Sequence, residues 1–190
     1  MRAEFALVEA GFDKMPAFSG NGNKVIVVNS GASALEARDK ITLATAQATT
    51  SGTAIDFTGI PSWVNRVTVT VYGVSWAVSS DSLLVQIGDS GGVETSGYSS
   101  LSASSNSSNL NSSAGFIINN STSISNTVNS TVILTKHTGN KWNATGTSTA
   151  FDVVTSFAGV KELTGTLDRV RLTSVTGVTF DAGAVNISYE

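Results

Sequence analysis

The chain has 190 residues, of which 41% are hydrophobic and 13% are charged, so it can bury a core but draws its polar surface mainly from Ser, Thr and Asn. The net charge is −3 and no basic stripe is present, which argues against nucleic-acid binding. The absence of Cys excludes disulfides, thiolate metal sites and Cys catalysis, and no stretch is apolar enough to predict membrane insertion.

Residues 2–15 are predicted to form a short helix that ends before Pro16. Its apolar residues recur at spacings of three and four, which places them in one stripe. A single short helix cannot hide such a stripe, so we expect it to serve in oligomerisation or attachment and the protein to be a homotrimer. Packing of the helix on its own subunit is the alternative. The stripe consists of Phe5, Val8, Phe12 and Met15.

Residues 17–40 are predicted to be a connector. Turn-forming residues occupy positions 20–23, a strand follows at residues 24–29, and small residues at 30–32 close it. With the helix, this connector forms an N-terminal region, residues 1–40, in which we expect an extended arm that can wrap over a neighbouring molecule.

From residue 41 onward, apolar and polar residues alternate with a period of two, and turn signals separate the runs. This pattern predicts one all-β domain over residues 41–190, an antiparallel jelly-roll-like β-sandwich, with the short helix and extended arm preceding it. The strands are expected around residues 67–72, 83–87, 132–134, 169–173 and 185–189. The turns are expected at residues 51–52, 91–92, 138–140 and 176–177.

Residues 99–130 are rich in Ser and Asn. We expect a long exposed loop, one strand at residues 115–119, and a second long loop. Long loops on a rigid sandwich commonly carry binding sites, although a solvated connector without a ligand explains the composition equally well.

The sequence Gly-Asp-Ser-Gly-Gly at residues 88–92 is similar to the nucleophile motif of chymotrypsin-like serine proteases. That chemistry needs a His base and an Asp that orients it, but the chain's one histidine, His137, follows the serine instead of preceding it. A strand end followed by a turn is the favoured interpretation. We therefore assign no catalytic residue and expect no enzyme. With one His, no Cys and no spaced Asp pattern for Ca²⁺, no metal or cofactor is expected either.

Trp63, Trp76 and Trp142 are the large aromatic anchors. Trp76 follows a well-alternating strand and is expected in the core. Trp142 lies between Lys141 and Asn143 after a turn, so these three residues are the best candidates for stacking on a sugar and hydrogen-bonding to it. Burial of Trp142 in the core is the alternative.

Three segments of the chain resemble a domain that recurs at the distal ends of tailed-phage fibre and tail proteins. Residues 2–5 and 20–35 resemble the segment that often precedes this domain. The resemblance implies a β-sandwich in a virion appendage that binds a host surface, and it brings no catalytic residue. The three segments are residues 53–61, residues 86–98, and residues 163–171 continuing to 180–187.

We therefore expect a structural phage virion protein, a tail fibre or similar appendage, that docks on other virion proteins through its N-terminal arm and displays the sandwich. A head fibre, a capsid decoration protein or a neck or tail adaptor is the first alternative. A carbohydrate-binding receptor module for a host-surface glycan is the second, and a polysaccharide depolymerase is the weakest. Neither nucleic acid nor a membrane is an expected partner.

Overall fold

A computed structural model describes residues 15–16, 19–22, 24–29, 31, 33–77, 81–105, 109–119 and 127–190. The secondary structure of these residues consists of strands, with no helix among them, so the predicted all-β class is confirmed. The predicted helix lies outside the described residues, apart from its exposed last residue, Met15. The strands are β1 (Val25–Val28), β2 (Leu35–Arg38), β3 (Thr42–Leu43), β4 (Gln47–Ala48), β5 (Ala54–Thr58), β6 (Arg66–Trp76), β7 (Leu83–Asp89), β8 (Gly92–Val93), β9 (Ser99–Ser104), β10 (Leu110–Ser112), β11 (Phe116–Ile117), β12 (Val128–Lys136), β13 (Lys141–Ala150), β14 (Val153–Glu162), β15 (Arg169–Ser174) and β16 (Phe180–Tyr189).

The chain divides into two compact units, Met1–Thr42 and Leu43–Glu190. In the first unit the predicted strand at residues 24–29 is present as β1, but it pairs antiparallel with β2 instead of continuing as an extended arm. The chain reverses because the Asn29 side chain accepts a hydrogen bond from the backbone N–H of Ser33 at 2.9 Å. The expectation of an extended arm is therefore wrong for this segment, which is a β-hairpin.

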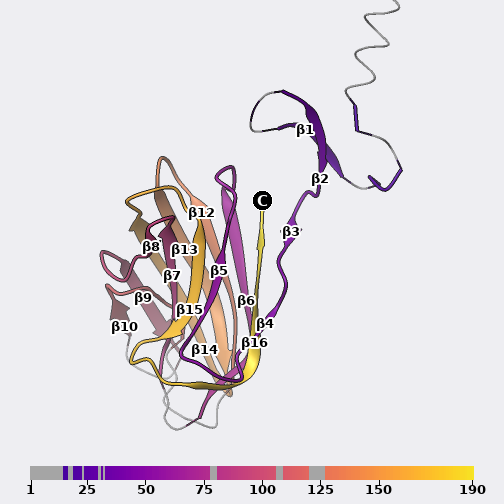
Figure 1. Cartoon of the computed structure of the whole chain (residues 1–190). Helices are drawn as coiled ribbons and strands as arrows, with labels where there is room; N and C mark the ends of the chain where they lie inside the picture. Colours follow the sequence, from indigo (N-terminus) through magenta and orange to yellow (C-terminus); the bar gives the residue numbers. More distant parts are fainter. Residues whose placement is uncertain are drawn as a thin grey trace, which may run out of the picture. The chain divides into compact units, whose positions relative to one another are not determined.

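Two antiparallel sheets build the second unit, and Figure 1 shows them as facing layers. The nine-stranded sheet has the order β10-β9-β14-β13-β12-β6-β16-β3, with β4 also paired to β16. The five-stranded sheet has the order β11-β7-β15-β5, with β8 paired to β7. Buried side chains from both sheets, such as Val69 of β6 and Ile87 of β7, belong to one hydrophobic core.

The pairings of the second unit are nested along the sequence. The hairpin β12–β13 lies innermost, the pair β9–β14 encloses it, and the pairs β7–β15 and β6–β16 enclose both. The outermost pair brings Val67 opposite Tyr189, so strands far apart in the sequence lie side by side in one sheet. Contacts this distant in sequence predict slow folding, because loop-closure entropy is lost before they form.

The alternation of apolar and polar residues along each strand explains which side chains form the core. In β6, Val67, Val69 and Val71 are buried, whereas Thr70 and Tyr72 of the same strand are exposed. The predicted core position of Trp76 is confirmed. The structure also has turns or bends at each of the predicted turn signals.

The Ser- and Asn-rich segment differs from its prediction. Residues 99–104 do not form an exposed loop but the strand β9, which pairs with β10 on one side and β14 on the other. The predicted strand at residues 115–119 is confirmed as the short strand β11. The strand β9 could not be recognised from the pattern of apolar residues, because its inward positions hold Ser100 and Ser102, which are buried although they are polar.

Candidate functional site

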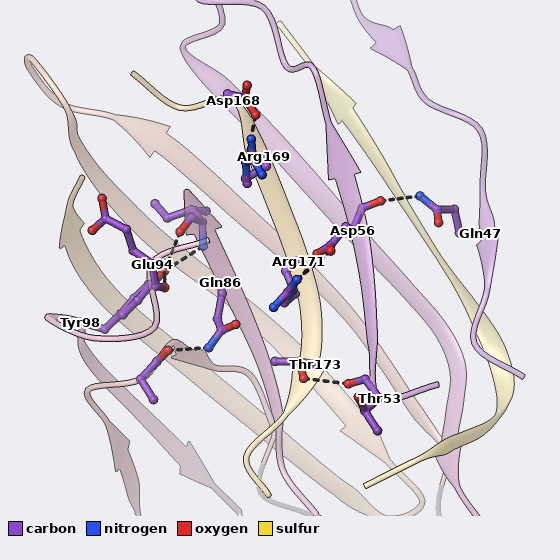
Figure 2. A network of polar contacts seen from close by, with 12 residues as sticks. Gln47, Thr53, Asp56, Gln86, Glu94, Tyr98, Asp168, Arg169, Arg171 and Thr173 are labelled. Carbon is purple, nitrogen blue, oxygen red and sulfur yellow. Dashed lines mark hydrogen bonds and ion pairs between the residues drawn. The ribbon is translucent and has the colours of Figure 1, made fainter. Parts of the chain in front are cut away.

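One end of the five-stranded sheet carries a group of interacting polar side chains, here called the Tyr98 cluster. It joins the end of β7 and the segment after it to the connection between β14 and β15. Its members therefore come from two of the segments that resemble phage tail proteins and from β14. Figure 2 shows Glu94 and Tyr98 side by side within it. The cluster consists of Asp89, Glu94, Tyr98, Lys161 and Thr164.

Tyr98 anchors the cluster to the backbone. The Ile87 N–H donates to its hydroxyl oxygen at 2.8 Å, and the hydroxyl lies 3.0 Å from the Ile87 carbonyl oxygen and 2.9 Å from that of Glu94. A bond to the backbone four residues upstream resembles the tyrosine corner of immunoglobulin-like sandwiches. The ring packs edge-on against Phe116, with 5.0 Å between centroids. Burial raises the pKa of Tyr98, so the phenol stays neutral and serves as a fixed tether.

A largely buried ion pair lies against this tyrosine. Lys161 and Glu94 contact each other with side chains only 7% and 18% exposed, and the Lys161 Nζ lies 5.3 Å from the centre of the Tyr98 ring. Burial alone would raise the pKa of Glu94, but hydrogen bonds from Lys161 and Thr164 outweigh it and lower this pKa below its ordinary value. The carboxylate is therefore ionised at neutral pH, with both of its oxygens engaged.

Thr164 connects this ion pair to the turn after β7. Its N–H donates to Glu94 Oε1 at 2.7 Å, and its hydroxyl lies 2.8 Å from both Glu94 Oε1 and Asp89 Oδ2. The Asp89 Oδ1 accepts the N–H of Gly91 at 2.8 Å. The bond from Thr164, followed by that from Gly91, lowers the pKa of Asp89. Both carboxylates of the cluster thus hold loops in place as acceptors.

The protease-like motif at residues 88–92 forms the end of β7, a turn and the start of β8, which confirms the favoured interpretation. Its glycine pattern follows from close packing: a Cβ atom on Gly88 would lie 2.0 Å from the Gly92 carbonyl oxygen. Likewise, a Cβ on Gly165 would lie 2.6 Å from Asp89 Oδ2. Ser90 is exposed, and its carbonyl accepts a bond from Arg169 at 3.4 Å. Turn geometry therefore accounts for the motif.

A pocket of about 540 Å³ lies beside the cluster. Lys141, Trp142 and Asn143 are among its lining residues, together with Tyr98 and Lys161, which the sequence analysis did not single out. The remaining residues that line the pocket are Gly97, Ser99, His137, Val160 and Glu162.

Trp142 is not the exposed stacking surface that its neighbours suggested. Its side chain is only 1% exposed and belongs to the hydrophobic core, whereas Lys141 and Asn143 are exposed. Strand alternation causes this difference, because successive residues of β13 point to opposite faces of the sheet. The Lys141 Nζ lies 3.9 Å from a carboxylate oxygen of Glu162, so the rim of the pocket carries a loose, exposed ion pair.

The sequence analysis did not single out Tyr98 or Lys161, although the sequence contains a weak signal for each. Tyr98 closes the second resembling segment, where an aromatic residue ends a run of turn-forming residues. Lys161 follows the buried residues Thr155 and Phe157 of β14 at even spacings, so its side chain points to the same inner face. Recognition of this strand would have predicted a buried charge at Lys161. The strand itself was not recognised, and the signal was lost with it.

The other predicted site residues are placed as follows. Phe5, Val8 and Phe12 lie outside the described residues, and Met15 is exposed. His137 is exposed beyond the end of β12, and its backbone N–H donates to the Lys141 carbonyl at 2.8 Å. Within the described part of the chain, no group of three or more His, Cys, Asp or Glu side chains is placed to hold a metal ion. Nor do these residues include a helix suited to crossing a membrane.

Comparison of the chain with protein-family models, with curated proteins and with solved structures finds no match. The resemblance to phage tail proteins therefore stays a prediction from the sequence. The function has to be argued from the geometry of the sheets, the Tyr98 cluster and the pocket.

Proposed function

We propose that the chain is a structural protein of a phage virion, a tail fibre or similar appendage, that displays its sandwich outward and is not an enzyme. The observation that carries the proposal is the convergence of the three resembling segments. They supply β5, the second half of β7 with β8, and the first half of β15, which pair with one another in the five-stranded sheet, and the continuation at residues 180–187 supplies most of β16 in the nine-stranded sheet. Segments that lie far apart in sequence thus combine into one structural unit, as expected if the resemblance concerns a whole domain.

Polar contacts between these segments support the same view. Arg171 of β15 holds Asp56 of β5 through two bonds, Nε to Oδ1 at 2.6 Å and Nη2 to Oδ2 at 2.7 Å (Figure 2). The bond to Asp56 raises the pKa of Arg171 further. Thr173 donates to the Thr53 carbonyl at 2.8 Å along the same pair of strands. Asp56 and Arg171, which belong to two of the resembling segments, thus stabilise the sheet, which is the role expected in a structural protein.

We further propose that the sandwich is jelly-roll-like and that residues 1–40 attach it to other virion proteins. The nested pairing of β6–β16, β7–β15, β9–β14 and β12–β13 supports the first point. The division of the chain at Thr42 supports a separate N-terminal attachment region. The homotrimer rests on the apolar stripe of the first sixteen residues, and light scattering of the intact protein tests it. A monomer at micromolar concentration contradicts it.

The proposal is tested by locating the chain in particles. Virions of the phage or prophage that encodes it are purified and analysed by quantitative mass spectrometry, and immunogold labelling then shows where the chain lies. A copy number that is a multiple of three, with label on the tail, supports the tail appendage. Label on the head selects the head fibre or decoration protein instead. Abundant protein in the lysate that is absent from purified particles contradicts a virion role.

Carbohydrate binding is the second candidate function, and the pocket beside the Tyr98 cluster favours it. Its rim offers the Lys141 ammonium, the Asn143 amide and His137, groups that hydrogen-bond to sugar hydroxyls. A glycan array of the intact protein tests it. Asn143→Ala and Lys141→Ala should each lose at least about tenfold in affinity, a typical loss for one charge-assisted bond, while Tyr72→Ala on a distant exposed site keeps it. A wild-type protein that binds no glycan contradicts this candidate.

A further inference from the structure

The side chains around the pocket beside the Tyr98 cluster favour donation of hydrogen bonds over acceptance. Three of the described residues that line it have side chains that can only donate, namely Lys141, Trp142 and Lys161. Glu162 alone among them brings a carboxylate, and the other polar side chains can both donate and accept. The pocket therefore suits a ligand that supplies acceptor oxygens.

Two of these donors, Trp142 and Lys161, are buried and keep hydrogen-bonding capacity that the fold does not use. The Trp142 side chain is 1% exposed, and its indole N–H has no hydrogen-bond partner among the described residues. The Lys161 ammonium has three N–H groups, and its contact with one oxygen of Glu94 leaves the others available. A buried donor without an acceptor is unfavourable, so a ligand oxygen that reaches these two groups contributes more than one that binds at the surface.

Gly97 leaves space beside the Lys161 ammonium in the pocket that both residues line. A Cβ atom on Gly97 would lie 3.3 Å from Lys161 Nζ, so a larger residue would crowd the ammonium. The φ of Gly97 is 75°, a left-handed conformation that glycine adopts without strain. The segment after β8 therefore approaches the charge with backbone alone.

We propose that this pocket binds the carboxylate of an acidic sugar, with the carboxylate at Lys161 and Trp142 and the sugar hydroxyls at Asn143. A carboxylate supplies two acceptor oxygens and a negative charge, and the lining residues carry two ammonium groups against the one carboxylate of Glu162. Glu94 shares the charge of Lys161, but it does not line the pocket and both of its oxygens are already engaged. Binding of an acidic sugar rests on the carbohydrate-binding function proposed above and narrows it to glycans that contain uronic or sialic acids.

Glu162 distinguishes an acidic ligand from a neutral one. Its side chain is 67% exposed, and its contact with Lys141 is loose, at 3.9 Å. Glu162 repels the carboxylate of an acidic sugar, whereas it accepts a hydrogen bond from a hydroxyl of a neutral sugar. Glu162→Gln should therefore strengthen the binding of an acidic glycan about twofold or more. Weaker binding of the acidic glycan by this variant contradicts the proposal.

A glycan array of the full chain tests the proposal with glycans that end in glucuronate, galacturonate or sialic acid and with their neutral and sulfated counterparts. The strongest ligand should carry a carboxylate. Conversion of this carboxylate to its methyl ester keeps the hydroxyls and removes the charge, so the affinity measured by calorimetry should fall at least about tenfold. A preference for neutral or sulfated glycans, or an ester that binds like the acid, overturns the acidic-sugar site and leaves carbohydrate binding in place. Binding of no glycan contradicts both.

Two pairs of variants separate contact with the ligand from effects on the fold. Trp142→Phe removes the indole N–H and should weaken binding of the acidic glycan about threefold or more. Its control is Trp76→Phe, which removes another buried indole N–H that has no partner and lies outside the pocket, and which should keep the affinity. Gly97→Ala should weaken binding to a similar extent because its methyl group crowds Lys161, whereas Gly177→Ala, with a φ of 74° and no atom within 4 Å of the added Cβ, should not. Circular dichroism shows that each variant is folded. Equal affinities within either pair overturn the placement of the carboxylate at Lys161 and Trp142.

Discussion

On the inner face of the nine-stranded sheet, β6 carries Val67, Val69 and Val71 at successive inward positions, whereas β9 carries Ser at each of its three. The strand register makes the contrast direct. One row crosses the sheet from Ser104 through Thr155, Ser148 and Ser130 to Val71 and Val185, so it begins with hydroxyls and ends with isopropyl groups. The β6 side of the sheet is an apolar half, and the β9–β14–β13 side is a hydroxyl-rich half.

The two halves meet the requirements of burial in different ways. In the apolar half, Val69 is flanked by the buried residues Val132 and Ile187, and the gain comes from removal of apolar surface from water. In the hydroxyl-rich half, Ser100 Oγ accepts the backbone N–H of Ile117 at 3.0 Å and so ties β9 to the opposite sheet. The hydroxyls of Ser102, Ser104 and Ser148, however, are buried without a hydrogen-bond partner. We infer that the hydroxyl-rich half contributes less to stability per residue, and four predictions sharpen this comparison.

The largest effect is expected at Lys161, a buried cation on β14 in the hydroxyl-rich half. Lys161→Met leaves the partly buried Glu94 carboxylate without its cation, and removal of one partner of this pair should cost about 2 kcal/mol, less than for a fully buried pair because water still reaches Glu94. Urea denaturation measures the loss in the free energy of unfolding. The double variant Lys161→Met, Glu94→Gln should recover part of it, because no uncompensated charge remains. A single variant as stable as wild type contradicts the assigned role of the pair.

In the apolar half, Val69→Thr should cost about 2 kcal/mol. The change keeps the side-chain shape but places a hydroxyl between Val132 and Ile187, whose apolar side chains cannot form a hydrogen bond with it. Chemical denaturation again gives the value. Thr68→Val on the half-buried outer side of the same strand is the control and should change stability by less than about 0.5 kcal/mol. If Val69→Thr proves equally mild, the two halves do not differ as described.

The same contrast decides what the sequence could predict. The strands around Val69, Val85, Val132, Val170 and Ile187 were recognised because apolar and polar residues alternate in them. In β9, β10, β13 and β14, by contrast, Ser, Thr, Ala and Gly occupy inward positions, so the period of two is hidden from a hydrophobicity pattern. The strands of the hydroxyl-rich half were therefore not predicted, because the polar character of their inward residues does not indicate that these residues are buried.

The candidate site shows the same limit. Trp142 was placed on the surface because its strand had not been recognised, and without the strand there was no basis for assigning its face. Lys161 was missed for that reason too. Gly146 of β13 illustrates a constraint that no single sequence reveals: a Cβ there would lie 2.6 Å from the Phe157 ring, so the glycine makes room for a core aromatic residue on the next strand.

A smaller effect of opposite sign is expected at Ser148. Ser148→Ala removes a buried hydroxyl that has no partner, so the free energy of unfolding should rise by about 1 kcal/mol. Ser130→Ala is the matched control, because the Ser130 hydroxyl donates to the Thr147 carbonyl at 3.1 Å, and its loss should destabilise by about 1 kcal/mol. Thermal and urea unfolding compare the pair. Destabilisation by Ser148→Ala indicates that ordered water satisfies the hydroxyl and removes the argument for a weaker half.

The smallest effect is the dependence of stability on acid, and it arises at Glu94. The pKa of Glu94 is lowered in the folded protein relative to its ordinary value of 4.5, because the bonds from Lys161 and Thr164 outweigh burial. The unfolded chain therefore binds the proton more tightly than the folded one, so this contribution is complete above pH 4.5 and is lost as the pH falls through the folded pKa. The advantage of wild type over Glu94→Gln should accordingly be constant near neutral pH and shrink in acid. Glu162→Gln, at an exposed carboxylate with only a loose 3.9 Å contact to Lys141, should run parallel to wild type throughout. An advantage of wild type over Glu94→Gln that grows in acid means that Glu94 takes up its proton more readily in the folded protein, and the ion pair then does not hold the Tyr98 cluster together.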